Sequence, residues 1–272
     1  MKYSVCIDSI FQDMTSEDAL EEVKAAGFTD FEFWAWWNRD IKNLKEKADS
    51  LSLHCSALCT RFISLTDPSK RNEYLAGLQE TLEAAKFMEA EFIISQVGND
   101  TGESRNLQHD SMIDGLKKAS PLLEGTGITL VIEPLNIRVD HAGYYLVSSD
   151  EGFEIIDAVG SKSVKLLFDI YHQQISEGDV LRRIENQIDK IGHFHAAGNP
   201  GRNELDKGEL NYPHIFGAID KMNYQNYMGL EYFPLENPTD GLKRLKTFCS
   251  QNLSTAKILL PLKKFTAAPR QN

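Results

Sequence analysis

Short apolar segments alternate with longer segments of helical periodicity along most of the chain. The apolar segments are rich in β-branched and aromatic residues, which is typical of buried strands. They lie at about residues 2–7, 29–33, 52–58, 91–96, 128–133, 164–169, 191–197 and 227–231. The pattern therefore predicts eight short strands.

The segments between these strands carry apolar residues at helical spacing. TSEDALEEVKAAGF begins with Thr15 or Ser16 as a helix cap and stops at Gly27. NEYLAGLQETLEAAKFM and SDEGFEIIDAVG predict two further helices. Alternating strands and helices imply a parallel sheet, and eight units without a composition break favour a closed barrel over an open doubly wound sheet. The predicted fold class is α/β, a (β/α)8 TIM barrel.

The length agrees with one barrel domain. The chain has 272 residues, 42% of them hydrophobic, and a TIM barrel takes about 250 residues. We expect residues 1–251 to form a single (β/α)8 domain. Residues 252–272 contain no acid and form an expected basic C-terminal tail, with its charges at Lys257, Lys263, Lys264 and Arg270.

The charge balance narrows the classes of partner. The formal net charge is −11, which would repel a phosphate backbone, so nucleic acid is not the expected substrate. No segment approaches the length of a membrane span or a signal peptide, and we expect a cytoplasmic protein that acts on a small molecule. Monomer and homo-oligomer both remain open. The four cysteines lack paired CxxC spacing and are expected to be reduced.

Four residues that can bind a metal close successive apolar segments. They are Glu133 in LVIEPLN, Asp169 in KLLFDIYH, His195 in HFHAAGNPGR and Glu231 in MGLEYFP. A lone carboxylate at such a position is usually a helix cap or a solvated loop residue, but four in successive units favour a shared site, because the carboxyl ends of barrel strands meet on one face. Three carboxylates with one imidazole suit one divalent ion, Mg²⁺, Mn²⁺ or Co²⁺.

The same segments resemble the xylose isomerase-like barrels, and most closely the hydroxypyruvate isomerase branch. The resemblance runs from about Leu130 to Pro234 and rests on IEPLN, FDIYH, HFHAAGNPGRNELDKGELNY and GLEYFP. It implies a metal-dependent isomerase of a small hydroxy-carbonyl compound, with hydroxypyruvate to tartronate semialdehyde as the leading reaction. Two positions depart from a simple assignment. Hydroxypyruvate isomerases commonly have Gln where this chain has His195, and a His at this position is similar to the ketose 3-epimerases. Those epimerases, however, usually have an acidic residue where this chain has Val139.

Isomerisation of an α-hydroxy carbonyl compound through an enediolate requires groups that move a proton and a cation that stabilises negative charge. Glu133 and Glu231 are the expected catalytic carboxylates, and each is also an expected ligand. His172 and Arg202 are the expected substrate-binding residues, because imidazole can donate to a substrate oxygen and guanidinium forms forked hydrogen bonds to a carboxylate. Arg138 is a weaker candidate for that second role.

Other residues near the strand ends have less specific roles. His193 and His54 are expected to be structural core residues. The cluster of Trp34, Trp36 and Trp37 either walls the site or forms a subunit contact.

Three other functions remain open from the residues. A ketose 3-epimerase would use the same metal-binding residues and is the nearest alternative. A nuclease with a multi-zinc site is disfavoured by the acidic charge and by the presence of only seven histidines. An inert sugar-binding relative would need a broken set of ligands, and all four positions are filled.

Overall fold

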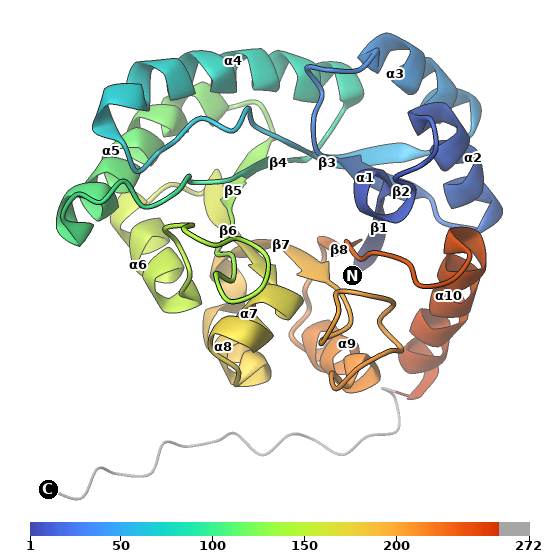
Figure 1. The fold of residues 1–272 in the computed structure, drawn as a ribbon. Helices are drawn as coiled ribbons and strands as arrows, with labels where there is room; N and C mark the ends of the chain where they lie inside the picture. The colour runs from blue at the N-terminus through green and yellow to red at the C-terminus, as the bar shows by residue number, and fades with distance from the viewer. Residues whose placement is uncertain (256–272) are drawn as a thin grey trace, which may run out of the picture.

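Eight parallel strands form a closed barrel in chain order, with β1 paired to β8. The computed structural model describes residues 1–255, with side chains described through residue 247. The predicted (β/α)8 class is confirmed, and the helices surround the ring of strands (Figure 1). The strands are β1 Lys2–Cys6, β2 Asp30–Phe33, β3 His54–Cys59, β4 Phe92–Ser95, β5 Thr129–Ile132, β6 Val164–Asp169, β7 Ile191–Ala196 and β8 Tyr227–Leu230.

The helices begin and end where local chemistry predicts. Thr15 caps α2 by accepting a hydrogen bond from the backbone N–H of Asp18 at 3.1 Å, and Ser148 caps α6 in the same way. Gly160 ends α6 in the left-handed conformation, with φ 69°. The α-helices are α1 Ile7–Ile10, α2 Ser16–Ala25, α3 Ile41–Ser50, α4 Arg71–Met88, α5 Arg105–Leu123, α6 Ser149–Val159, α7 Ile170–Ser176, α8 Val180–Gln187, α9 Tyr212–Lys221 and α10 Pro238–Thr255; two short 3₁₀ helices are η1 Pro68–Lys70 and η2 Ile188–Lys190.

Two sets of buried apolar side chains hold these elements together. The larger set fills the space between the strands and the surrounding helices. The smaller set comes from inward-facing strand positions and consists of Ala57, Cys59, Phe92, Ile94, Val131, Leu167 and Tyr227. The barrel interior is therefore packed, as in other barrels of this kind. Inward-facing polar residues nearer the carboxyl ends of the strands therefore pack on this apolar interior.

Helix α10 continues to Thr255, past the domain boundary expected at residue 251. The charged residues of the expected tail, Lys257 to Arg270, lie outside the described residues. The three cysteines whose side chains are described, Cys6, Cys55 and Cys59, are buried and free. Across residues 1–255, none of the helices has both the length and the apolar content needed to cross a lipid bilayer.

Candidate metal centre and active site

The four residues at the predicted strand ends converge at the carboxyl ends of β5 to β8. Glu133 follows β5, Asp169 ends β6, His195 lies in β7 and Glu231 follows β8. All four are buried, and each offers a ligand atom within 4.8 Å of the others. Parallel strands with a common direction bring together residues that lie about 30 positions apart in the sequence. We refer to these four residues as the ligand cluster.

Three atoms of the ligand cluster are buried without a hydrogen-bond partner in the described part of the chain: Glu133 Oε1, His195 Nδ1 and His195 Nε2. Glu133 Oε1 lies 3.5 Å from His195 Nδ1, and His195 Nδ1 lies 3.5 Å from Glu231 Oε2. A buried polar atom without a hydrogen-bond partner destabilises the folded protein, so we expect these atoms to contact a bound ion or ligand. Three carboxylate groups and one imidazole nitrogen are ligands that Mg²⁺, Mn²⁺ or Co²⁺ accept. The cluster therefore fits one divalent cation.

The electrostatics of the cluster also favour a cation. Burial raises the pKa of Asp169 to about 7; the nearby Glu133 carboxylate acts in the same direction, and His195 opposes both. Burial also disfavours the ionised form of Glu231, but His195 and Arg202 outweigh it and hold the pKa of Glu231 well below its usual range. The carboxylates thus depend on positive charge nearby in order to stay ionised together.

Asp169 is oriented by the helix that follows it. Its Oδ1 accepts hydrogen bonds from the backbone N–H groups of Tyr171 at 2.8 Å and His172 at 3.3 Å. These bonds cap the N-terminus of α7, where the helix dipole favours negative charge. One oxygen of Asp169 is therefore structural, and the other is free to face the cluster.

His172 presents one ring nitrogen to the cluster. Its Nδ1 lies 2.6 Å from Nδ2 of Asn136, which can only donate, so the ring proton is on Nε2. Nε2 lies 3.6 Å from Asp169 Oδ2 and has no hydrogen-bond partner among the described residues. Burial and the Arg202 charge hold the pKa of His172 well below its usual range, so the ring is neutral. His172 is thus a free donor beside the ligand cluster.

Arg202 joins the site from the loop after β7. One of its terminal nitrogens donates to Glu231 Oε2, and another lies 3.8 Å from Asp140 Oδ1. The guanidinium is also within 5.5 Å of the centre of the Tyr171 ring. Its Nε is buried without a hydrogen-bond partner in the described structure. By contrast, Arg138 is exposed at the surface.

The three tryptophans divide between the site and the surface around it. Trp34 donates from its indole nitrogen to Glu231 Oε1 at 2.7 Å, so it forms part of the site wall. Trp36 packs edge-on against Trp37 with ring centres 5.9 Å apart, and Trp37 packs in the same way against Phe62. Only Trp34 contacts the ligand cluster.

Sequence reasoning missed two acidic residues at the site. Glu32 lies in β2 and contacts both His193 and His195 from below. An acid between two phenylalanines, Phe31 and Phe33, is the signal that would have found it. Asp140 lies beside Arg202 and accepts a hydrogen bond from the Tyr171 hydroxyl at 2.9 Å. It directly follows Val139, the position at which ketose 3-epimerases usually have an acidic residue.

The two histidines expected in the core have different environments. His193 is fully buried in the barrel interior, as predicted. The prediction for His54 was wrong. Its side chain is 38% exposed and lies 3.3 Å from Asp30, because it begins β3 at the amino-terminal end of the barrel, where side chains meet solvent.

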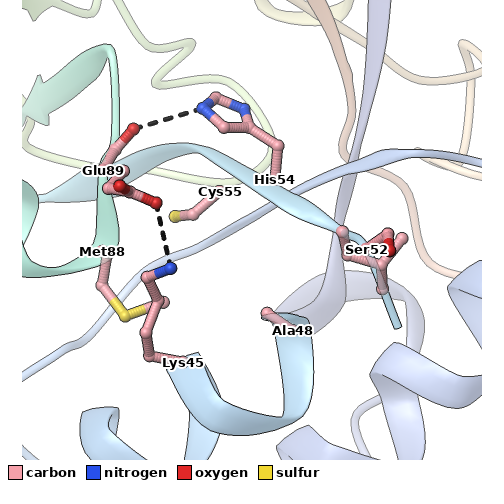
Figure 2. Close-up of a pocket in the computed structure, with 8 residues that line it drawn as sticks. Lys45, Ala48, Ser52, His54, Cys55, Met88 and Glu89 are labelled. Carbon is pink, nitrogen blue, oxygen red and sulfur yellow. Dashed lines mark hydrogen bonds and ion pairs between the residues drawn. The ribbon is translucent and has the colours of Figure 1, made fainter. Parts of the chain in front are cut away.

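A pocket at that opposite end is shown in Figure 2. It has a volume of about 160 Å³. His54 Nε2 lies 3.2 Å from the Glu89 backbone oxygen, and Lys45 Nζ donates to the Glu89 carboxylate at 3.0 Å. Polar groups already paired in this way are typical of the stabilising face of a barrel rather than of its catalytic face.

Known proteins share both the sequence pattern and the fold. The chain is 29% identical over 253 residues to a hydroxypyruvate isomerase of Escherichia coli K12, covering 89% of this chain and 97% of that relative. It is 41% identical over 136 residues to a 2-oxo-tetronate isomerase of Cupriavidus necator, covering 50% of this chain and 52% of that relative, so this second match spans about half of each protein.

A solved structure extends the comparison to three dimensions. The crystal structure of an AP endonuclease, family 2, from Brucella melitensis superposes with a TM-score of 0.87 at 24% identity, covering 90% of this chain and 98% of that one. This likeness concerns the fold alone. Residues 20–248 match the family described as xylose isomerase-like TIM barrel. The chain belongs to the xylose isomerase-like TIM barrel family.

Proposed function

We propose that this protein is a metal-dependent isomerase of a small hydroxy-carbonyl compound, with conversion of hydroxypyruvate to tartronate semialdehyde as its reaction. The observation that carries the proposal is the ligand cluster, whose Glu133 Oε1 and His195 Nδ1 are buried without partners. Full-length similarity to a protein named hydroxypyruvate isomerase supports the substrate. The buried free thiols of Cys6, Cys55 and Cys59 agree with a reducing compartment, and we place the reaction in the cytoplasm.

The reaction moves one proton between neighbouring carbons. A proton leaves the hydroxyl-bearing carbon, an enediolate forms, and a proton is delivered to the former carbonyl carbon, while the former hydroxyl oxygen loses its proton and the former carbonyl oxygen gains one. When bound, Mg²⁺, Mn²⁺ or Co²⁺ would supply Lewis-acid stabilisation of the developing negative charge. Glu133 and Glu231 would exchange the proton, because they follow β5 and β8 and approach the cluster from different sides of the barrel.

The two glutamates are held differently. Glu231 accepts hydrogen bonds from Trp34 and Arg202, which fix its orientation and lower its basicity. Glu133 Oε1 has no hydrogen-bond partner among the described residues. We therefore assign proton abstraction to Glu133. Glu231 would receive a proton, from Glu133 or from solvent, and deliver it to the neighbouring carbon, so that the cycle ends with the protonation states with which it began. His172 would donate its Nε2 proton to a substrate oxygen.

A substrate panel tests the proposal. Protein supplied with Mn²⁺, Co²⁺ or Mg²⁺ should convert hydroxypyruvate to tartronate semialdehyde, followed by a reductase-coupled assay or by NMR of the product. Turnover of D-fructose or D-tagatose without turnover of the acid would replace the proposal with a ketose 3-epimerase. Absence of turnover of any hydroxy-carbonyl compound in protein that binds a divalent cation would favour an inert relative.

Arg202→Ala is expected to raise KM for hydroxypyruvate by roughly 10- to 100-fold, because one or two charge-assisted hydrogen bonds to the substrate carboxylate are lost. Lysine should restore KM only in part, because an ammonium group has no fork. Turnover should also fall, since Arg202 donates to Glu231. Steady-state kinetics provides the measurement, and Arg182→Ala is the matched control, because Arg182 is exposed on α8. An unchanged KM for Arg202→Ala would place the substrate carboxylate elsewhere.

A further inference from the structure

Glu32 lies directly beneath the ligand cluster, inside the barrel. Its Oε1 is 2.8 Å from His195 Nε2, and its Oε2 is 3.0 Å from His193 Nε2. Glu32 and His195 are each only 2% exposed, so water does not compete for these contacts. The imidazole of His195 therefore has a carboxylate on one nitrogen and the ligand cluster on the other.

Two irregularities in strand pairing lie beside these side chains. The pairing of β2 with β3 shifts between Phe31 and Glu32, and the pairing of β6 with β7 shifts between Leu166 and Leu167. A bulge of this kind places one extra residue on one strand of a pair. The extra residue is Ser56 of β3 in the first shift and Gly192 of β7, just before His193, in the second. Both shifts therefore adjoin the residues that meet under the cluster.

The two oxygens of Glu32 have different tasks. Oε2 receives His193 and also the hydroxyl of Ser56, which donates at 3.4 Å. The single proton of the Ser56 hydroxyl can go instead to the Phe31 backbone oxygen at 3.1 Å, and the hydroxyl oxygen lies 2.5 Å from that of Ser4. These contacts anchor the carboxylate. Oε1 lies 2.8 Å from His195 Nε2, and neither of these two buried atoms has a hydrogen-bond partner among the described residues.

Gly229 leaves the space that this contact needs. It pairs with His195 across β7 and β8. A Cβ placed on Gly229 would come within 2.5 Å of both Glu32 Oε1 and His195 Cδ2. Any larger residue would therefore push the carboxylate and the imidazole apart. Three strands, β2, β7 and β8, thus combine to hold one contact.

We propose that Glu32 is a positioning residue for the metal centre, which accepts the Nε2 proton of His195 and so directs the lone pair of Nδ1 at the bound cation. Carboxylate–histidine–metal arrangements of this kind fix the tautomer and the orientation of the ring. The inference rests on the proposed function, because it assumes that the ligand cluster binds a cation. His193 and Ser56 would act one step further away, by holding the carboxylate in place.

The experiment compares Co²⁺ binding by the wild type and by Glu32→Gln. The amide cannot accept from both histidines, so His195 loses its fixed tautomer. We expect the dissociation constant for Co²⁺, from isothermal titration calorimetry, to rise roughly 10- to 100-fold. The visible Co²⁺ absorption band should shift as well, because the geometry of the nitrogen ligand changes. Ser120→Ala, which removes a buried hydroxyl that donates to the Leu116 backbone oxygen within α5, is the matched control and should behave as the wild type.

A double variant separates positioning from simple charge. In a His195→Ala background, Glu32→Gln should cause no additional loss of Co²⁺ affinity, since the residue through which Glu32 acts is gone. An additional loss of the same size would show a general effect of charge and would overturn the inference. Two bound ions in the wild type, one of them lost with Glu32, would overturn it too, because Glu32, His193 and His195 would then form a second metal site.

A second substitution keeps the test valid if Glu32→Gln does not fold. Gly229→Ala leaves the carboxylate chemically intact and separates it from His195, so it should weaken Co²⁺ binding in the same direction. Thermal unfolding of the metal-free proteins measures any structural effect separately. A wild type that does not bind Co²⁺ would overturn the proposed function. A wild type that binds Co²⁺ together with variants of equal affinity would overturn only the role of Glu32.

Discussion

Glu133→Gln is expected to reduce turnover by at least ~10²–10⁴, the usual contribution of a general base. Glutamine keeps the shape of the side chain, but its amide is neither a base nor a strong ligand. The carboxylate it replaces has a buried oxygen 3.5 Å from His195 Nδ1 that has no hydrogen-bond partner among the described residues. The measurement is the kcat of metal-saturated protein for hydroxypyruvate.

The control for this variant is Glu236→Gln, an exposed carboxylate in the loop after β8 that pairs with Lys207 and Arg244. It should retain full turnover. Substrate incubated with the wild type in D₂O should acquire deuterium at the carbon that gains the proton, unless the proton is carried over internally. A near-normal rate in Glu133→Gln would remove Glu133 from the mechanism and leave Glu231 as the base.

Removal of the metal is expected to abolish activity, and Asp169→Asn is expected to lower metal occupancy well below the one ion per chain expected of the wild type. An amide oxygen binds a divalent cation more weakly than a carboxylate does. Asparagine can still cap α7, because its side-chain oxygen can accept from Tyr171 and His172 as Asp169 does. The variant should therefore fold and lose mainly the metal. Elemental analysis of protein purified without chelator gives the occupancy.

Thermal unfolding provides an independent readout of the same site. A ligand present at 100 times its dissociation constant stabilises the native state by about 2.7 kcal/mol. Mn²⁺ or Co²⁺ should therefore raise the Tm of the wild type and of Asp110→Asn, an exposed control, more than that of Asp169→Asn. Wild-type protein that contains no metal and gains no activity from added Mn²⁺, Co²⁺ or Mg²⁺ would contradict the metal-dependent mechanism.

The sequence alone determined the fold class and the meeting point of the ligand cluster. Strand and helix periods are local properties, and in a barrel each strand has the same direction. A polar residue that closes an apolar segment therefore lies on the same face as every other such residue. Glu133, Asp169, His195 and Glu231 could be grouped on this ground, and the structure brings them together.

The tertiary structure decided which side chains surround the cluster. Trp34 reaches Glu231 across 197 positions of sequence because β1 closes the barrel against β8 and brings β2 close to it. Glu32 alternates with Phe31 and Phe33 along β2, but its contact with His195 depends on the approach of β7, which lies 163 positions further along the chain. His54 lies in an apolar segment, as core residues do, yet it is the first residue of its strand and its side chain is exposed to solvent. Contacts of this kind depend on closure, register and depth within the barrel, and these are set by packing between distant segments rather than by the residues of any one of them.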